Sequence, residues 1–378
     1  MTASAPAPSE ADLRAALATV HDPEIHRPIT DLDMVESIQV EGTHVRVRIL
    51  LTIPGCPMSE RIRADVERAL TAVPEVGTVD VDLGAMTPEQ RQALTERLRS
   101  AGGTRDIPFN RPTSLTRVLA IGSGKGGVGK SSVTANLAAA MAASGLRVGV
   151  LDADIHGFSI PAMLGITQQP TKVDDLLMPP TGHGVKVMSI GMFVPPGQAV
   201  VWRGPKLHRA IEQFATDVFW GDLDVLLLDL PPGTGDVAIS VTQLLPGAEL
   251  VVVTTPQPTA SDVAERVGSL AAGVDQKVAG VVENMSWLDA PGGERIEVFG
   301  SGGGQRVAQS LSARLGYEVP VLGQIPLEPQ LRAGADAGIP VVIGTPECAA
   351  ARALRQVADT LAHMPRGLGG RKLNLNVQ

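Results

Sequence analysis

The chain has 378 residues, and 32 Lys and Arg against 40 Asp and Glu give a formal net charge of −8. This length predicts two or three domains at about 150 residues each, and the 44% of hydrophobic residues excludes an intrinsically disordered chain. Two cysteines exclude a disulfide scaffold and any four-cysteine metal site within one chain, although two chains together would supply four. The acidic balance predicts no nucleic-acid partner. No long apolar stretch or leader segment is visible, so we expect a cytoplasmic protein with no membrane partner.

Residues 9–86 are predicted to form a small α+β domain. Ser9 is placed to cap a helix in which Leu13 and Leu17 lie on one face. Alternating apolar residues then indicate strands, and a helix separates the second strand from the third. The order is helix, strand, strand, helix and strand, with the last four over residues 35–40, 44–52, 58–73 and 76–83.

Residues 87–115 are predicted to be a helix and a linker. Thr87 and Gln90 have the spacing of a capping box at a helix start. Gly, Pro and polar residues from about Ala101 onward are typical of a linker. At the other end, residues 366–378 are basic and glycine-rich, and they are expected to be a flexible tail without the apolar face of a membrane-binding helix.

Residues 116–365 have the pattern of an α/β domain, in which apolar strands alternate with helical segments. Runs that are apolar on both faces are typical of a buried parallel sheet. We therefore expect a mostly parallel sheet with helices on both faces. The predicted strands lie at residues 118–122, 148–154, 185–191, 224–230, 250–255, 278–284 and 319–326.

A phosphate-binding loop is the strongest motif of the chain. Residues 124–131, GKGGVGKS, match G-x-x-x-x-G-K-[ST] between a predicted strand and a predicted helix. Glycines let backbone N–H groups face phosphate oxygens, and the helix N-terminus adds the positive end of its dipole. Lys130 is expected to reach the β- and γ-phosphates, and the Ser131 hydroxyl to ligate Mg²⁺. The expected nucleotide-binding residues here are Gly124, Lys125, Gly126, Gly127, Val128, Gly129, Lys130, Ser131 and Ser132.

Carboxylates follow two of the predicted strands. Asp152 and Asp154 come at the C-terminal end of a strand, where open parallel sheets bind ligands. Two such groups can address the hydration shell of Mg²⁺ and an attacking water. Asp229 ends a second apolar run in a Walker B pattern and is expected to hold Mg²⁺ through water, and the following loop, residues 231–236, can sense the γ-phosphate. Lys125, a second lysine in the phosphate loop, can either fold back on its own nucleotide or reach across a dimer interface.

These motifs carry a resemblance to known ATPases. KGGVGK, residues 125–130, resembles the deviant Walker A signature of the MinD/ParA/nitrogenase iron protein class. Together with DADIHG, SIPAMLG, VVWRGP, DLPPGTGD, VTTPQ, VENMSW and FGSGGG, it is similar to the Mrp/ApbC family of iron–sulfur cluster carrier P-loop ATPases. DPE at residues 22–24 and TIPGCP around Cys56 resemble the SufT-like domain fused to many of these proteins.

The resemblance implies roles for particular residues. Lys125 would contact the partner's nucleotide in a homodimer, Asp154 would position the attacking water, and Asp229 would be the Walker B aspartate. Asn284 would hydrogen-bond the adenine, for which an amide that donates and accepts is suited. Trp202 and Arg203 match a family segment near the dimer interface, although ordinary core packing explains Trp202 equally well.

The chain departs from the family at the expected cluster ligands. Many members carry Cys-x-x-Cys after the adenine-binding Asn, but here Ala290 and Gly293 stand where the cysteines are expected, and neither can ligate iron. Cys348 is expected to be structural. Cys56 precedes a proline at a helix start, where the thiolate is favoured, so it is either an iron or cluster ligand or a small buried side chain.

The combined prediction is an ATP-hydrolysing homodimer that binds iron–sulfur clusters and transfers them to apoproteins. ATP and Mg²⁺ are the expected cofactors, with an iron–sulfur cluster as a further candidate, and cluster recipients or cluster-assembly proteins are the expected partners. Two alternatives stay open. One is an ATPase switch of the ParA/MinD class without a cluster, and the other is a nucleotide-binding scaffold or regulator.

Overall fold

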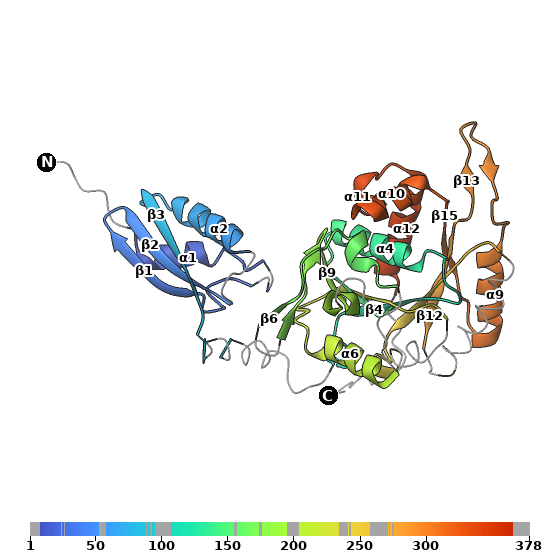
Figure 1. The fold of residues 1–378 in the computed structure, drawn as a ribbon, viewed down its shortest axis with the longest axis horizontal. Coiled ribbons are helices and arrows are strands. Elements are labelled where there is room, and N and C mark those ends of the chain that lie inside the picture. Colours follow the sequence, from blue (N-terminus) through green and yellow to red (C-terminus); the bar gives the residue numbers. More distant parts are fainter. Residues whose placement is uncertain are drawn as a thin grey trace, which may run out of the picture. The chain divides into compact units, whose positions relative to one another are not determined.

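The protein, described here as a computed structural model, consists of two compact units (Figure 1). The first comprises residues 1–105 together with Thr171–Met178 and Asp217–Gly221, and the second comprises the rest. Sequence patterns did not anticipate that the two later segments join the first unit, and the predicted domain limits stay a prediction. The structure describes residues 8–23, 25, 27–52, 58–87, 89–90, 93–94, 107–154, 157–173, 176–194, 204–233, 241, 243–257, 271, 273 and 276–365.

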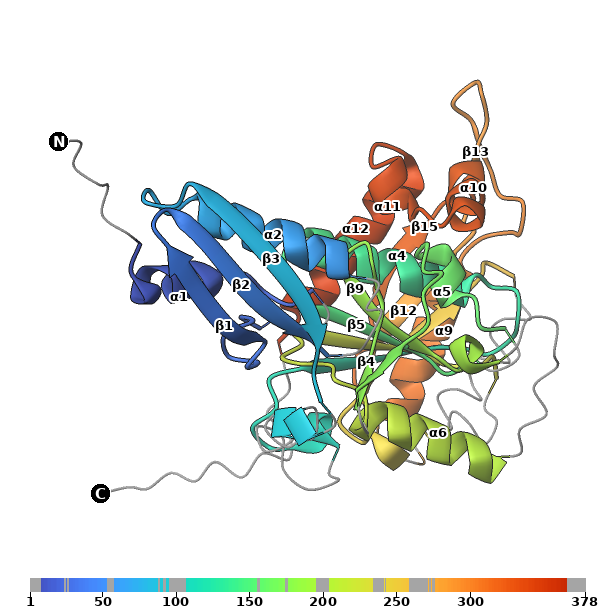
Figure 2. The same cartoon turned by 60° about the vertical axis from the view of Figure 1, so that its left-hand side comes forward.

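The N-terminal part of the first unit has the predicted order of elements. Ser9 caps the first helix, because its side chain accepts a hydrogen bond from the Asp12 amide at 3.1 Å. The first two strands pair antiparallel and the second and third pair parallel, and both helices lie against one face of this sheet (Figure 2). Thr87 and Gln90 form the predicted reciprocal capping box. The elements are α1 (Glu10–Leu17), β1 (Val35–Glu41), β2 (His44–Leu51), α2 (Ser59–Thr71) and β3 (Thr78–Ala85), and the later segment adds the antiparallel pair β6 (Thr171–Val173) and β7 (Leu176–Met178).

An eight-stranded sheet forms the centre of the second unit, in the order β15-β12-β11-β4-β10-β5-β9-β8. All seven predicted strands are present and pair parallel, and a short edge strand, β8, pairs antiparallel with β9. The strands are β4 (Arg117–Ser123), β5 (Val148–Asp152), β8 (Thr181–Gly182), β9 (Val185–Ser189), β10 (Val225–Asp229), β11 (Glu249–Thr254), β12 (Val278–Asn284) and β15 (Val321–Ile325).

Helices cover both faces of this sheet (Figures 1 and 2). On one face α4 packs against α12, and on the other α9 packs against β12 and β15. The central strands are therefore buried on both sides, and Leu119, Val150 and Leu227 are fully buried. The helices are α4 (Lys130–Ala143), α5 (Ile160–Met163), α6 (Gly204–Thr216), α9 (Gly303–Leu315), α10 (Pro329–Ala337), α11 (Val341–Gly344) and α12 (Ala349–His363), with 3₁₀ turns η1 (Pro108–Asn110) and η2 (Ile190–Phe193).

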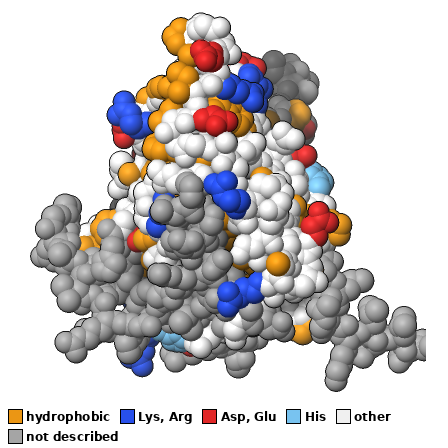
Figure 3. Space-filling model, turned by 90° about the vertical axis from the view of Figure 1, so that its right-hand side faces the viewer, with side chains coloured by type: hydrophobic (Ala, Val, Ile, Leu, Met, Phe, Trp, Pro, Cys, Tyr) orange, Lys and Arg blue, Asp and Glu red, His pale blue; other side chains and the backbone are white. Residues whose placement is uncertain are grey.

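A small hairpin, β13 (Leu288–Asp289) with β14 (Arg295–Ile296), projects from the second unit between β12 and α9. Ile296 and Val298 are exposed there, and the Arg295 guanidinium stacks on the Trp287 ring at 4.2 Å from its centroid. Figure 3 shows apolar side chains gathered at this projection beside charged ones of both signs. Among the described residues, no helix is both long enough and apolar enough to cross a membrane.

The strand register brings the functional segments together. Asp229, the last residue of β10, lies opposite Ile121 of β4 on one side and Asp152 of β5 on the other. The phosphate loop follows β4, so it begins at the same edge of the sheet at which both aspartates end their strands. This is the carboxyl edge, where open α/β sheets bind ligands.

Candidate nucleotide-binding site

The phosphate loop forms a cradle between β4 and α4. Gly127 and Gly129 have positive φ angles of 79° and 81°, a conformation that favours glycine. A Cβ at Gly129 would lie 2.3 Å from Nδ2 of Asn284, so only glycine fits there. Gly126 and Gly127 are exposed, and the loop with Asp154 and Pro232 lines a hollow of about 200 Å³. The loop therefore offers backbone donors to an anion at the start of a helix.

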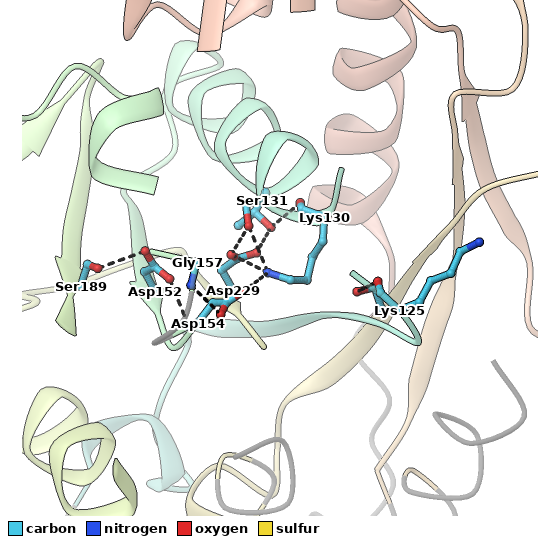
Figure 4. Close-up of polar contacts among 10 residues, drawn as sticks. Lys125, Lys130, Ser131, Asp152, Asp154, Gly157, Ser189 and Asp229 are labelled. Carbon is cyan, nitrogen blue, oxygen red and sulfur yellow. Dashed lines mark hydrogen bonds and ion pairs between the residues drawn. The ribbon is translucent and has the colours of Figure 1, made fainter. Parts of the chain in front are cut away.

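The buried Lys130 and the half-buried Ser131 meet the carboxylate of Asp229 (Figure 4). Oδ2 of Asp229 accepts hydrogen bonds from Nζ of Lys130 and from Oγ of Ser131, each at 2.6 Å. Nζ of Lys130 also lies 3.8 Å from Oδ2 of Asp154. Lys130 is 6% exposed and Asp229 is fully buried. Each of these buried charges depends on its hydrogen-bonded partner, because removal of one would leave the other buried and uncompensated.

Two residues that the sequence analysis missed hold the carboxylates in place. Thr134, one turn after Lys130 in α4, donates its hydroxyl to Oδ1 of Asp229 at 2.7 Å. Ser189, the last residue of β9, donates its hydroxyl to Oδ2 of Asp152 at 3.0 Å. The spacing of Thr134 from Lys130 is the signal that could have identified it. Ser189 could be recognised only once β9 was known to lie beside β5.

The carboxylates form an acidic group next to the buried Lys130. Burial raises the pKa of Asp152 well above its usual value, and the neighbouring charge of Asp229 raises it further. The Asp154 carboxylate is oriented by the amide of Gly157, which donates to its Oδ1 at 3.1 Å. Oxygen ligands are those that Mg²⁺ prefers, and Mg²⁺ commonly takes one or two carboxylates together with substrate phosphates. The donor set of Ser131, Asp152 and Asp229 therefore fits Mg²⁺.

Lys125 and Asn284, the other predicted nucleotide-binding residues, lie on the side of the loop nearer β11 and β12. The Lys125 side chain points away from the Lys130–Asp229 pair (Figure 4), and its Nζ donates to Oε1 of Gln257 at 2.6 Å. Nδ2 of Asn284 donates to the carbonyl of Val128 at 2.9 Å. Within the described part of the chain, Oδ1 of Asn284 is buried and has no hydrogen-bond partner.

Of the two cysteines, Cys348 alone lies within the residues that the structure describes. Cys348 is the N-cap of α12, where its Sγ accepts a hydrogen bond from the Ala351 amide at 3.4 Å. Cys56, Trp202, Arg203 and Asp236 lie outside the described residues, so the hypotheses about them stay predictions. Nowhere in the described ranges do three or more His, Cys, Asp or Glu side chains form a group that could hold a metal ion by themselves.

A phosphate loop at the carboxyl edge of a parallel sheet, with its lysine and serine meeting the aspartate of the neighbouring strand, defines a P-loop NTPase. Residues 114–362 match the family model described as the NUBPL iron-transfer P-loop NTPase, and residues 10–81 match the model described as an iron–sulfur cluster assembly protein. The chain belongs to the NUBPL iron-transfer P-loop NTPase family.

Relatives cover almost the whole chain. A Mycobacterium tuberculosis protein named iron–sulfur cluster carrier protein is 56% identical over 97% of this chain and 96% of its own length. A Deinococcus radiodurans protein of the same name is 45% identical, covering 93% of this chain and 94% of the relative. A solved structure of a nucleotide-binding protein from Archaeoglobus fulgidus, in complex with ADP, is 37% identical with a TM-score of 0.51, covering 59% of this chain and 86% of that one.

Proposed function

We propose that the chain is a cytoplasmic, Mg²⁺-dependent ATPase that works as a homodimer and carries iron–sulfur clusters to apoproteins. The observation that carries the proposal is the convergence of Lys130, Ser131 and Asp229 at the phosphate hollow. The cargo is inferred from the printed names of relatives that match nearly the whole chain.

Each polar group of the site would have a separate role in ATP hydrolysis. The loop amides and Lys130 would bind the β- and γ-phosphates, and the lysine would exchange its contact with Asp229 for phosphate oxygens. Ser131, Asp152 and Asp229 would hold Mg²⁺, in part through water, and the ion supplies electrostatic stabilisation of the charge that develops on the phosphoryl oxygens. Asp154 lines the hollow and is oriented by Gly157, so it would position the attacking water.

Adenine recognition is supported by the amide of Asn284. Its Nδ2 donates to the phosphate loop, which leaves the buried Oδ1 as an acceptor without a partner among the described residues. The 6-amino group of adenine is a donor, whereas guanine presents an oxygen at that position. The remaining acceptor therefore favours ATP over GTP.

A homodimer is supported by the direction of Lys125, which turns away from the Lys130–Asp229 pair of its own chain. A lysine that points away from its own phosphate site and contacts only the neutral Gln257 amide among the described residues can be recruited to the nucleotide of a second copy. Neutralising charge on the transferred phosphoryl group from two chains would couple hydrolysis to dimerisation. Hydrolysis would then reset the dimer, and we expect a low turnover.

The cluster is the cargo of this ATPase, and Cys56 is the candidate thiolate ligand. The sequence has two cysteines, and Cys348 is occupied as the N-cap of α12. Two copies would supply two Cys56 thiolates, so the remaining cluster ligands would come from other groups or from a partner protein.

The test is anaerobic reconstitution with iron and sulfide of the wild type, Cys56→Ser and the matched control Cys348→Ser, followed by ATPase assays with Asp229→Asn. We expect a bound cluster that is lost in Cys56→Ser and kept in Cys348→Ser, and hydrolysis that falls at least about 100-fold in Asp229→Asn. A cluster content that is the same in all three proteins would contradict the role of Cys56.

A second candidate, an ATPase switch without a cluster, is favoured by Ala290 and Gly293 at the positions where the family pattern has cysteines. Mg²⁺-dependent ATP hydrolysis by a wild type that takes up no cluster would support this switch. It would overturn the carrier proposal.

A further inference from the structure

The two lysines of the phosphate loop have different partners, and their side chains point in different directions (Figure 4). Lys130 binds the carboxylate of Asp229, whereas Lys125 donates to the side-chain amide of Gln257 at 2.6 Å. Gln257 lies 132 positions further along the chain, three residues after the end of β11. The Lys125–Gln257 hydrogen bond is therefore a tertiary contact between the phosphate loop and the segment that follows β11.

The acceptor of this contact is neutral. In the described ranges no carboxylate forms an ion pair with Lys125, although Lys130 and Asp229 are paired at 2.6 Å a few residues away. The Lys125–Gln257 hydrogen bond contains one charged group, whereas a phosphate oxygen would add a second, opposite charge and its Coulomb attraction to the ammonium. A phosphate oxygen is consequently a better acceptor for the Lys125 ammonium than the Gln257 amide, and it can displace that amide.

The backbones at both ends of the contact are held. Oγ of Ser123 donates to the carbonyl of Lys125 at 3.0 Å, which fixes the loop. On the other side, the carbonyl of Pro256 accepts a hydrogen bond from Arg306 of α9 at 2.9 Å. A Cβ at Gly303 would lie 2.4 Å from the Thr255 carbonyl, so the start of α9 packs directly on this segment. Release of Lys125 therefore requires rotation of its side chain rather than a movement of the loop.

The structure also provides space for that rotation. Lys125 and Gln257 line a second hollow of about 160 Å³, which shares residues 125–128 with the phosphate hollow. Lys125 is half-buried and its neighbours Gly126 and Gly127 are exposed. The ammonium can thus leave Gln257 without crossing packed side chains.

We propose that Gln257 is a positioning residue that holds Lys125 in a resting orientation until a nucleotide phosphate displaces it. This rests on the proposed function in one respect, namely that Lys125 acts on a phosphate. Gln257 then sets how readily the lysine becomes available. A stronger acceptor at position 257 retains the lysine, and a missing acceptor releases it.

The test compares Gln257→Glu and Gln257→Ala, each in the wild type and in Lys125→Ala. Steady-state ATP hydrolysis is measured over a range of protein and ATP concentrations, with Gln305→Ala, an exposed glutamine of α9, as the control. A carboxylate at position 257 strengthens the contact with Lys125. The protein or ATP concentration that gives half-maximal activity should therefore rise about five-fold in Gln257→Glu, and the rise should be smaller at high salt because salt screens the two charges. Gln257→Ala should lower it, and neither change should have an effect in Lys125→Ala.

The quantity that shifts identifies the nucleotide concerned. A shift in the protein concentration that gives half-maximal activity means that Lys125 acts across a dimer. A shift in the KM for ATP means that Lys125 acts on its own nucleotide. Both results support the resting contact. The positioning role is overturned if both Gln257 variants behave as the wild type while Lys125→Ala impairs hydrolysis. It is equally overturned if their effects persist in Lys125→Ala. Full activity of Lys125→Ala would overturn both the positioning role and the proposed role of the lysine.

Discussion

Replacement of Thr134 by valine tests whether the second oxygen of the Asp229 carboxylate needs its hydroxyl partner. Thr134 is fully buried in α4, and its hydroxyl donates to Oδ1 of Asp229 at 2.7 Å. Valine has nearly the same shape and keeps the β-branched side chain, but it removes the donor. Oδ2 keeps its contacts with Lys130 and Ser131, so the loss falls mainly on Oδ1, and the Lys130 carbonyl loses its 3.0 Å contact with the same hydroxyl.

The expected loss of stability follows from the charge and burial of this acceptor. A hydrogen bond to a charged group contributes about 1.5–3 kcal/mol, and no other side chain in the described ranges donates to Oδ1 of Asp229. We therefore expect Thr134→Val to lower the free energy of unfolding by about 2 kcal/mol. In a unit of this size such a change lowers the melting temperature by about 4–8 °C.

The assay is urea unfolding of the nucleotide-free protein, followed by circular dichroism, with Thr134→Ser as the matched control. Serine keeps the hydroxyl, so its effect should be well below that of valine. ATP turnover should also fall in the valine variant, because Asp229 loses one of the contacts that orient it. Each 1.4 kcal/mol of transition-state stabilisation that is lost in this way lowers the rate about ten-fold. A valine variant that unfolds at the wild-type urea concentration would refute the reasoning.

Three further predictions concern other parts of the site. Burial and Asp229 raise the pKa of Asp152, so its charged form is destabilised in the folded state. In a pH series of thermal melts, Asp152→Asn should raise the melting temperature at pH values above the pKa that Asp152 has in the folded protein. This gain should vanish below about pH 3.8, the pKa of Asp152 in the unfolded chain, because the carboxyl group is then protonated in both states. Gly129→Ala introduces a Cβ 2.3 Å from Nδ2 of Asn284 at a positive φ. ADP affinity measured by calorimetry should therefore fall by at least about ten-fold. Cys348→Ser places a preferred N-cap residue at α12, and an unchanged or slightly raised stability in urea is expected, with a drop arguing against the capping role.

The sequence by itself determined the local features of this protein. The spacing of Gly124, Gly129 and Lys130 specified the phosphate loop, because glycine is favoured at the positive φ angles of Gly127 and Gly129 and the start of α4 supplies aligned amides. Apolar runs that end in Asp152 and Asp229 predicted both the buried parallel strands and the carboxylates at their ends. These features are encoded within short windows of the chain, where propensity and hydrophobic period act directly.

The tertiary structure alone decided which distant side chains meet at the site. Strand β10 lies between β4 and β5 although it follows both in the sequence, and this order brings Thr134 to Asp229 across 95 positions. The contact between Ser189 and Asp152 depends on β9 lying beside β5, and Gln257 reaches Lys125 across the end of β11. A hydrogen bond requires donor and acceptor to lie within about 3 Å. No periodic pattern along the chain specifies such a distance, because strand order and register set it.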